Sequence, residues 1–180
     1  MPYIPLREDQ PGIRGLLAFK PASGAPIAQL IHQLLRGASP LSAYDRERLA
    51  AHVSRLNECE FCARSHGAAA RHLDHHKPAD DMPRTATSEE TDPKLAALFD
   101  LAEVVVRGGH YVTEDQIKAA RAAGATDEEI HDAVLIASAF CMLNRYVDGL
   151  GAITPDDESA YDAMGIHLAA HGYLRSAPPN

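Results

Sequence analysis

Apolar residues along this chain recur at the three- and four-residue spacing of an amphipathic helix, and alternating strand patterns are absent. One such stripe ends at Gly37 and comprises Ile27, Leu30, Ile31, Leu34 and Leu35. Abundant alanine and an aromatic content of only 6% also favour helix. The pattern predicts an all-α protein, a single domain over residues 1–180 that forms a bundle of about seven helices.

Start and stop signals bound the expected helices. Thr113 and Thr126 each stand three residues before a Gln or Glu, the capping box that opens a helix. The expected helices cover approximately residues 25–36, 42–56, 59–75, 92–107, 113–124, 130–146 and 155–171. Residues 1–24, rich in Pro and Gly, are expected to form an extended N-terminal arm, and residues 77–92 a polar loop.

Length and charge narrow the class of protein. A chain of 180 residues is long enough to bury a full core. A net charge of −8, without clustered Lys and Arg, argues against a nucleic-acid surface. The first residues lack a cationic stretch followed by an apolar run, and no stretch of about 18 apolar residues appears. A cytoplasmic protein with no membrane span and no nucleic-acid partner is therefore expected.

The candidate chemistry lies in a C-x-x-C motif. Two of the three cysteines, Cys59 and Cys62, form it, and His66 follows four residues after the second. The motif opens a predicted helix, whose unsatisfied N–H groups and positive dipole end favour a thiolate. Cys62 and His66 would stand one turn apart on the same helix face, close enough for proton transfer. This pattern indicates thiol chemistry and permits a Cys59–Cys62 disulfide.

Glu47 is the best candidate for a residue that orients His66. It lies on the helix before the C-x-x-C motif, and an antiparallel hairpin turning near residues 56–58 would bring it to the height of His66. The alternative is a solvated surface acid, since Arg46 and Arg48 flank Glu47. The spacing by itself leaves both interpretations open.

A metal site is the main alternative at the motif. Cys59, Cys62 and His66 could supply three ligands, with a fourth from His72, His75 or His76. A structural zinc site, however, normally takes its second ligand pair from a separate element, and all these candidates fall on one predicted helix. We therefore expect neither a metal nor another cofactor. The third cysteine, Cys141, is expected to be an inert buried thiol.

Together, Glu47, Cys59, Cys62 and His66 form the pattern E-x11-C-x-x-C-x3-H. This pattern resembles that of the AhpD-like branch of the carboxymuconolactone decarboxylase family, and in particular its peroxidase-related subgroup. The likeness extends over nearly the full chain. It includes residues 4–5 (Ile-Pro), 53–57 (Val-Ser-Arg-Leu-Asn) and 144–151 (Asn-Arg-Tyr-Val-Asp-Gly-Leu-Gly).

The resemblance implies a thiol-dependent peroxidase of the alkylhydroperoxidase type. Cys62 would be the attacking thiolate, Cys59 the resolving thiol, and His66 with Glu47 the proton relay. The partners implied are a peroxide substrate, an external thiol or disulfide reductase, and further copies of the chain in a homo-oligomer (hexamer, trimer or dimer). One position departs from the pattern: the best-studied members carry His directly before the second cysteine, where this chain has Phe61.

Other activities remain open at this point. A non-peroxidase thiol–disulfide oxidoreductase or a redox sensor would use the same pair of cysteines. The decarboxylase or lactone-type activity of the wider family works without this pair, so the presence of Cys59 and Cys62 argues against it.

Overall fold

Helices account for the regular structure of this chain in a computed structural model that describes residues 1–74 and 92–174. Within these ranges there are eight α-helices, a 3-10 turn and no strand. They are α1 (Ile13–Phe19), α2 (Pro21–Arg36), α3 (Ala43–Leu56), α4 (Glu60–Leu73), α5 (Pro93–Arg107), η2 (Gly109–Tyr111), α6 (Glu114–Ala122), α7 (Asp127–Gly149) and α8 (Glu158–His171). The all-α prediction is confirmed.

The expected extended arm over residues 1–24 is wrong from residue 13 onward. Helix α1 begins after Gly12, which adopts a left-handed φ of 59°, and α2 begins at Pro21 rather than near residue 25. Proline suits the first position of a helix, where its missing N–H has no intrahelical partner. At Gly24, a Cβ would lie 2.1 Å from the Leu17 carbonyl oxygen, so glycine lets α1 and α2 pack closely. The predicted polar loop at 77–92 lies outside the described residues except for Asp92, which caps α5.

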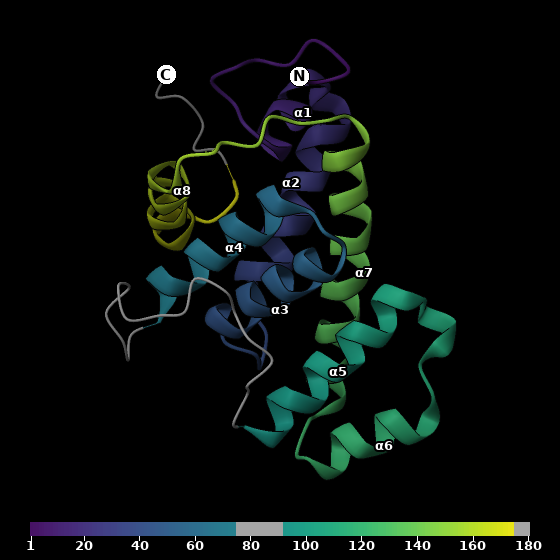
Figure 1. The fold of residues 1–180 in the computed structure, drawn as a ribbon. Helices are drawn as coiled ribbons and strands as arrows, with labels where there is room; N and C mark the ends of the chain where they lie inside the picture. The colour runs from purple at the N-terminus through teal and green to yellow at the C-terminus, as the bar shows by residue number, and fades with distance from the viewer. Residues whose placement is uncertain (75–91, 175–180) are drawn as a thin grey trace.

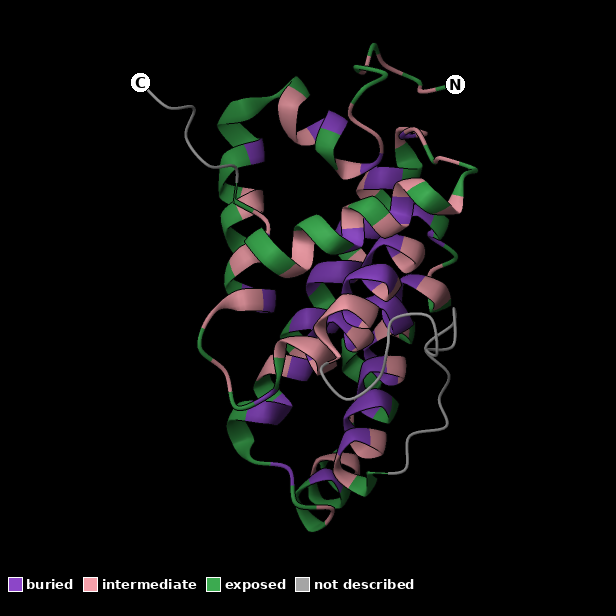
Figure 2. Cartoon of the chain, turned by 90° about the vertical axis from the view of Figure 1, so that its left-hand side faces the viewer, coloured by how far each residue is buried: buried purple, intermediate pink, exposed green. Residues whose placement is uncertain are grey.

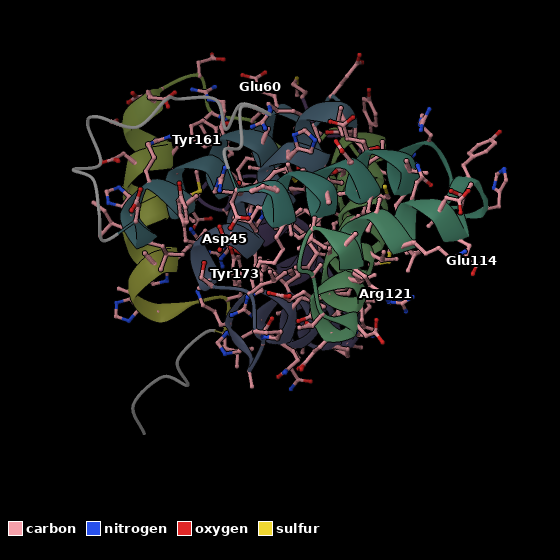
Figure 3. All side chains as sticks on the ribbon, turned by 90° about the horizontal axis from the view of Figure 1, so that it is seen from below. Asp45, Glu60, Glu114, Arg121, Tyr161 and Tyr173 are labelled. Atoms are coloured by element: carbon pink, nitrogen blue, oxygen red, sulfur yellow. The ribbon has the colours of Figure 1, made fainter. Side chains whose placement is uncertain are left out.

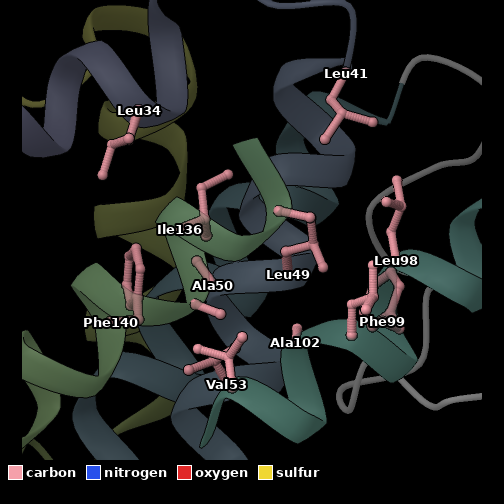
Figure 4. Packing of buried hydrophobic residues seen from close by; sticks show 14 of the residues in the cluster. Leu34, Leu41, Leu49, Ala50, Val53, Leu98, Phe99, Ala102, Ile136 and Phe140 are labelled. Atoms are coloured by element: carbon pink, nitrogen blue, oxygen red, sulfur yellow. The ribbon is translucent and has the colours of Figure 1, made fainter. Parts of the chain in front are cut away.

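The main core lies between α3, α5 and α7, and Figure 4 shows how their side chains meet. Figure 2 shows buried residues running through the interior of the bundle. The main contributions are Leu49, Ala50 and Val53 from α3, Leu98, Phe99 and Ala102 from α5, and Ile136 and Phe140 from α7. This core fixes α3, which carries Glu47. None of the described helices is both long and apolar enough to cross a bilayer.

A second buried cluster surrounds the two cysteines of the motif. Cys59 and Cys62 pack there with side chains from four further segments. The cluster comprises Leu16, Cys59, Phe61, Cys62, Ala68, Val147, Ala152 and Tyr161. Leu16 comes from α1, so the N-terminal helix that the sequence pattern did not predict helps to bury the cysteine pair.

Helix α8 packs against α4 on the side away from α5 and α6 (Figure 1). The contact depends on Gly165, where a Cβ would lie 2.7 Å from the Ala68 carbonyl carbon.

We expect Gly165→Ala to destabilise the protein by about 1–3 kcal/mol, because the added methyl forces α8 away from the α4 backbone. Gly67→Ala is the matched control: no atom lies within 4 Å of its added Cβ. That change should stabilise the protein by roughly 0.5–1 kcal/mol, since alanine favours helix. Urea unfolding followed by circular dichroism measures both. Equal effects of the two substitutions would contradict a close contact at Gly165.

Candidate active site

A short turn between α3 and α4 carries the cysteine motif. The Cys59 amide donates to the Ser54 carbonyl oxygen at 2.9 Å, and the Asn57 amide donates to that of Val53 at 3.0 Å. Glu58 takes a left-handed φ of 61°, which is uncommon for a residue other than glycine. The turn places Cys59 at the N-cap of α4 and Cys62 in its first turn. Both thiols therefore lie at the positive end of the helix.

Glu47 and His66 meet inside the α3–α4 hairpin. The Oε2 atom of Glu47 lies 2.7 Å from Nδ1 of His66, and Glu47 has no exposed surface. The alternative of a solvated surface acid is therefore wrong. The flanking Arg46 is itself buried and donates to the Leu34 and Gly37 carbonyl oxygens at 3.0 Å. The hairpin geometry thus brings together the two residues that the sequence spacing proposed as partners.

Two further side chains contact the Glu47 carboxylate. Nη2 of Arg36 lies 2.7 Å from Glu47 Oε1, and the Tyr173 hydroxyl donates to the same oxygen at 2.5 Å. Burial by itself raises the pKa of Glu47, but the charge and hydrogen bond of His66 and the charge of Arg36 outweigh it and leave this pKa lowered. Glu47 is therefore a buried carboxylate at neutral pH.

The cysteines are both reduced and buried, and their environments differ. The pKa of Cys59 is raised strongly, first by its hydrogen bond with the Cys62 thiol and next by burial, with a smaller contribution from Asp148. Cys62 follows in the first turn of α4, one turn before His66. His66 packs edge-on against Phe140 with ring centroids 4.7 Å apart. The Cys59 thiol is thus held in its protonated form.

Sequence reasoning missed Arg36 and Tyr173. Arg36 ends α2, and Tyr173 follows α8 near the C-terminus, so neither falls near the C-x-x-C motif in sequence. Neither residue belongs to a recognisable motif. Only the packing of α2 and the C-terminal segment around α3 brings both to Glu47.

A buried polar network anchors the turn that carries Cys59. Asn144 of α7 is fully buried and donates to the Ser54 hydroxyl at 3.0 Å, while its own Oδ1 accepts from Asn57 at 3.0 Å. A polar asparagine within the otherwise apolar helix expected over 130–146 is the sequence signal that could have indicated this role. Cys141, expected to be buried, is half-buried, and its sulfur lies 3.6 Å from the side-chain nitrogen (Nδ2) of Asn57.

Phe61, at the position of the departure from the family pattern, is buried against Tyr161, with ring centroids 6.0 Å apart. A Cβ on Gly12 would lie 2.0 Å from the Phe61 ring, so the N-terminal segment crosses directly over this side chain. Phe61 therefore offers packing at this position and no proton donor or acceptor.

Of the three histidines considered as a fourth metal ligand, His75 and His76 lie outside the described residues. Nε2 of His72 lies 2.7 Å from Asp162 on α8 and so pairs with an acid instead of the cysteines. Among residues 1–74 and 92–174, no group of three or more His, Cys, Asp or Glu side chains is arranged to hold a metal ion.

We expect the Glu47 carboxylate to make stability depend on acidity. Because its pKa is lowered in the folded state, its stabilisation is complete above the unfolded value of about 4.3 and is lost as the pH falls through the folded value. Glu47→Gln should cost about 2–4 kcal/mol at neutral pH, because it leaves the Arg36 guanidinium, which is only 12% exposed, without its carboxylate. Urea unfolding from neutral pH to below the unfolded value of about 4.3 gives the free energy of unfolding of both proteins. The difference between them should become smaller in acid. A difference that stays constant would contradict the lowered pKa of Glu47.

Several solved structures match this fold, and two of them show the extent of the likeness. One is an uncharacterized peroxidase-related protein from Silicibacter sp. TM1040, with a TM-score of 0.74 and 24% identity over 86% of this chain and 80% of that chain. The other is the alkylhydroperoxidase AhpD core of an uncharacterized peroxidase-related protein from Ralstonia eutropha JMP134, with a TM-score of 0.70 and 27% identity over 87% and 81%. No family model matches the sequence, and the comparison with curated proteins finds no match. The resemblance predicted from the sequence is confirmed by these structures: the chain has the all-α fold of the AhpD core found in peroxidase-related proteins.

Proposed function

We propose that this protein is a thiol-dependent peroxidase that reduces hydroperoxides through Cys62 and Cys59. The Cys62 thiolate attacks the terminal oxygen of the hydroperoxide, the O–O bond breaks, and Cys62 becomes a sulfenic acid. The departing alkoxide takes a proton from His66 and leaves as the alcohol. The Cys59 thiol then condenses with the sulfenic acid, which releases water and forms the disulfide, and an external dithiol returns both cysteines to thiols.

The observation that carries this proposal is the buried contact of 2.7 Å between Glu47 and His66, one turn after the cysteine pair. A carboxylate at Nδ1 orients the imidazole and fixes which ring nitrogen carries the hydrogen. His66 can then accept the Cys62 proton and pass it to the alkoxide. The cysteine motif and the solved AhpD-core relative support the same chemistry.

Thiol–disulfide exchange without peroxide is the second candidate, and Phe61 is the observation that favours it. An apolar ring beside Cys62 supplies no proton for a departing alkoxide. Exchange with a disulfide depends less on a proton donor for the leaving group, because a thiolate of low pKa leaves readily without protonation.

Peroxide consumption by the purified protein, across a panel of monothiol and dithiol reductants, tests the proposal. We expect consumption that depends on both the reductant and Cys62. Reductant-dependent cleavage of a model disulfide without peroxide consumption would favour the second candidate. Peroxide loss that is independent of added reductant would contradict both.

We further propose that the protein works as a homo-oligomer. Apolar side chains remain exposed on several helices, including Leu30 on α2 and Met142 on α7, which are 38% and 48% exposed. Light scattering at micromolar concentration should return a mass several times that of one 19.4 kDa chain. A monomer under these conditions would contradict association.

A further inference from the structure

We propose that Tyr173 and Arg36 are positioning residues of the relay. They fix the Glu47 carboxylate so that Nδ1 of His66 carries the hydrogen. Nε2 then has a free lone pair and can act as the base. This inference rests on the proposed function, since it describes the same relay. It assigns to the C-terminal segment a part in the chemistry that neither the motif nor the fold likeness contains.

The oxygen atoms around His66 Nδ1 determine the tautomer. Glu47 Oε2 lies 2.7 Å from this nitrogen, and the Tyr173 oxygen lies 3.2 Å from it. The Tyr173 hydroxyl donates its hydrogen to Glu47 Oε1. The Tyr173 oxygen and Glu47 Oε2 therefore both present lone pairs to Nδ1 of His66. Nδ1 must therefore carry the hydrogen, and in a neutral imidazole Nε2 is then the acceptor. This is the tautomer that can take a proton from a thiol.

Tyr173 is held in this place by its own surroundings. Its amide donates to Nδ1 of His32 on α2 at 3.3 Å, and its ring stacks on that of His66 with centroids 5.9 Å apart. Gly172 turns the chain with a φ of 68°, and a Cβ there would lie 2.9 Å from the His32 ring. Burial and the nearby Glu47 charge raise the pKa of Tyr173 well above its ordinary value, which keeps the hydroxyl protonated as a donor. Figure 3 shows Tyr173 between α8 and the rest of the bundle.

Arg36 links the C-terminal helix to the same carboxylate. Its Nη2 atom donates to the Leu168 carbonyl oxygen in the last turn of α8 at 3.0 Å and also contacts Glu47 Oε1 at 2.7 Å. The guanidinium carbon lies 5.3 Å from the centre of the Tyr173 ring. Arg36 thus fixes the end of α8, the Tyr173 ring and the Glu47 carboxylate together.

Tyr173→Phe tests the proposal, because it keeps the ring and removes only the hydroxyl. The first readout is the rate of Cys62 alkylation by iodoacetamide as a function of pH, with the labelled peptide identified by mass spectrometry. We expect alkylation at neutral pH to slow about tenfold, and its pH midpoint to rise, because a hydrogen bond to a charged group is lost and His66 is less well oriented. Tyr111→Phe, at an exposed position on η2, is the matched control and should behave like wild type.

The second readout is the tautomer itself, from ¹⁵N spectra of histidine-labelled protein at alkaline pH, with the His66 signals assigned by their loss in His66→Asn. We expect hydrogen on Nδ1 in the wild type and a mixture of tautomers in Tyr173→Phe. Gly172→Ala should displace Tyr173 without removing its hydroxyl, because the added Cβ would lie 2.9 Å from the His32 ring. It should also slow the alkylation of Cys62 and give a mixture of His66 tautomers.

A wild-type His66 with its hydrogen on Nε2, or an unchanged alkylation profile in Tyr173→Phe, would overturn the positioning role. Neither readout uses peroxide, so a protein that consumes no peroxide would overturn the proposed function and leave this inference to be judged by its own two measurements.

Discussion

Cys62→Ser is expected to abolish reductant-dependent peroxide consumption, whereas Cys59→Ser is expected to allow about one turnover and then stop. The difference follows from the roles proposed for the two thiols. Hydrogen bonding to Cys62 and burial raise the pKa of Cys59, which suits a resolving thiol that attacks a sulfenic acid later. Without Cys62, no thiolate remains to attack the peroxide. Without Cys59, the sulfenic acid forms at Cys62 and has no neighbour with which to condense.

A rapid-mixing assay distinguishes the two variants. Cys59→Ser should consume about one equivalent of peroxide per chain in a burst, and dimedone should then label Cys62. Cys62→Ser should show neither the burst nor the label. Cys141→Ser is the matched control, because this half-buried thiol lies on α7 outside the buried cluster of Cys59 and Cys62, and it should retain full turnover. A burst in Cys62→Ser with dimedone on Cys59 would reverse the two assignments.

The sequence predicted the centre of the site because local rules determine it. A C-x-x-C at the start of a helix, a histidine one turn later and a glutamate on the preceding helix need only a short turn to come together. The structure brings Glu47 and His66 to 2.7 Å in this way. The capping boxes at Thr113 and Thr126 likewise mark the starts of α6 and α7, although α7 begins at Asp127, three residues before the expected bound of 130.

The rest of the site depends on contacts between segments far apart in sequence, which local patterns do not encode. Tyr173 reaches Glu47 across 126 positions of the chain. Helix α1 forms where Pro and Gly predicted an extended arm, because Leu16 gains burial against the cysteine cluster and Gly24 permits a close helix crossing. In each case packing outweighed the local preference of the chain.

Glu47→Gln is expected to slow peroxide consumption by roughly 10²–10⁴-fold per folded molecule, the usual contribution of a positioned acid–base pair. The carboxylate accepts hydrogen bonds on both oxygens: Oε2 faces His66, and Oε1 faces Arg36 and Tyr173. A glutamine has only one acceptor oxygen. If its NH₂ group faces His66, the imidazole must move its hydrogen to Nε2 and can no longer accept a proton there. If the NH₂ group faces Arg36, two donors oppose each other in a buried site.

A second buried histidine, His52 on α3, provides the control for this substitution. Nε2 of His52 lies 2.9 Å from Glu103, a glutamate on α5 whose side chain is 44% exposed. Glu103→Gln changes a more exposed Glu–His pair outside the cysteine cluster, so turnover should stay at the wild-type rate. Far-ultraviolet circular dichroism gives the folded fraction by which each rate is divided. If Glu47→Gln and Glu103→Gln consumed peroxide equally fast, the buried carboxylate would serve the packing of the α3–α4 hairpin and not the chemistry of Cys62.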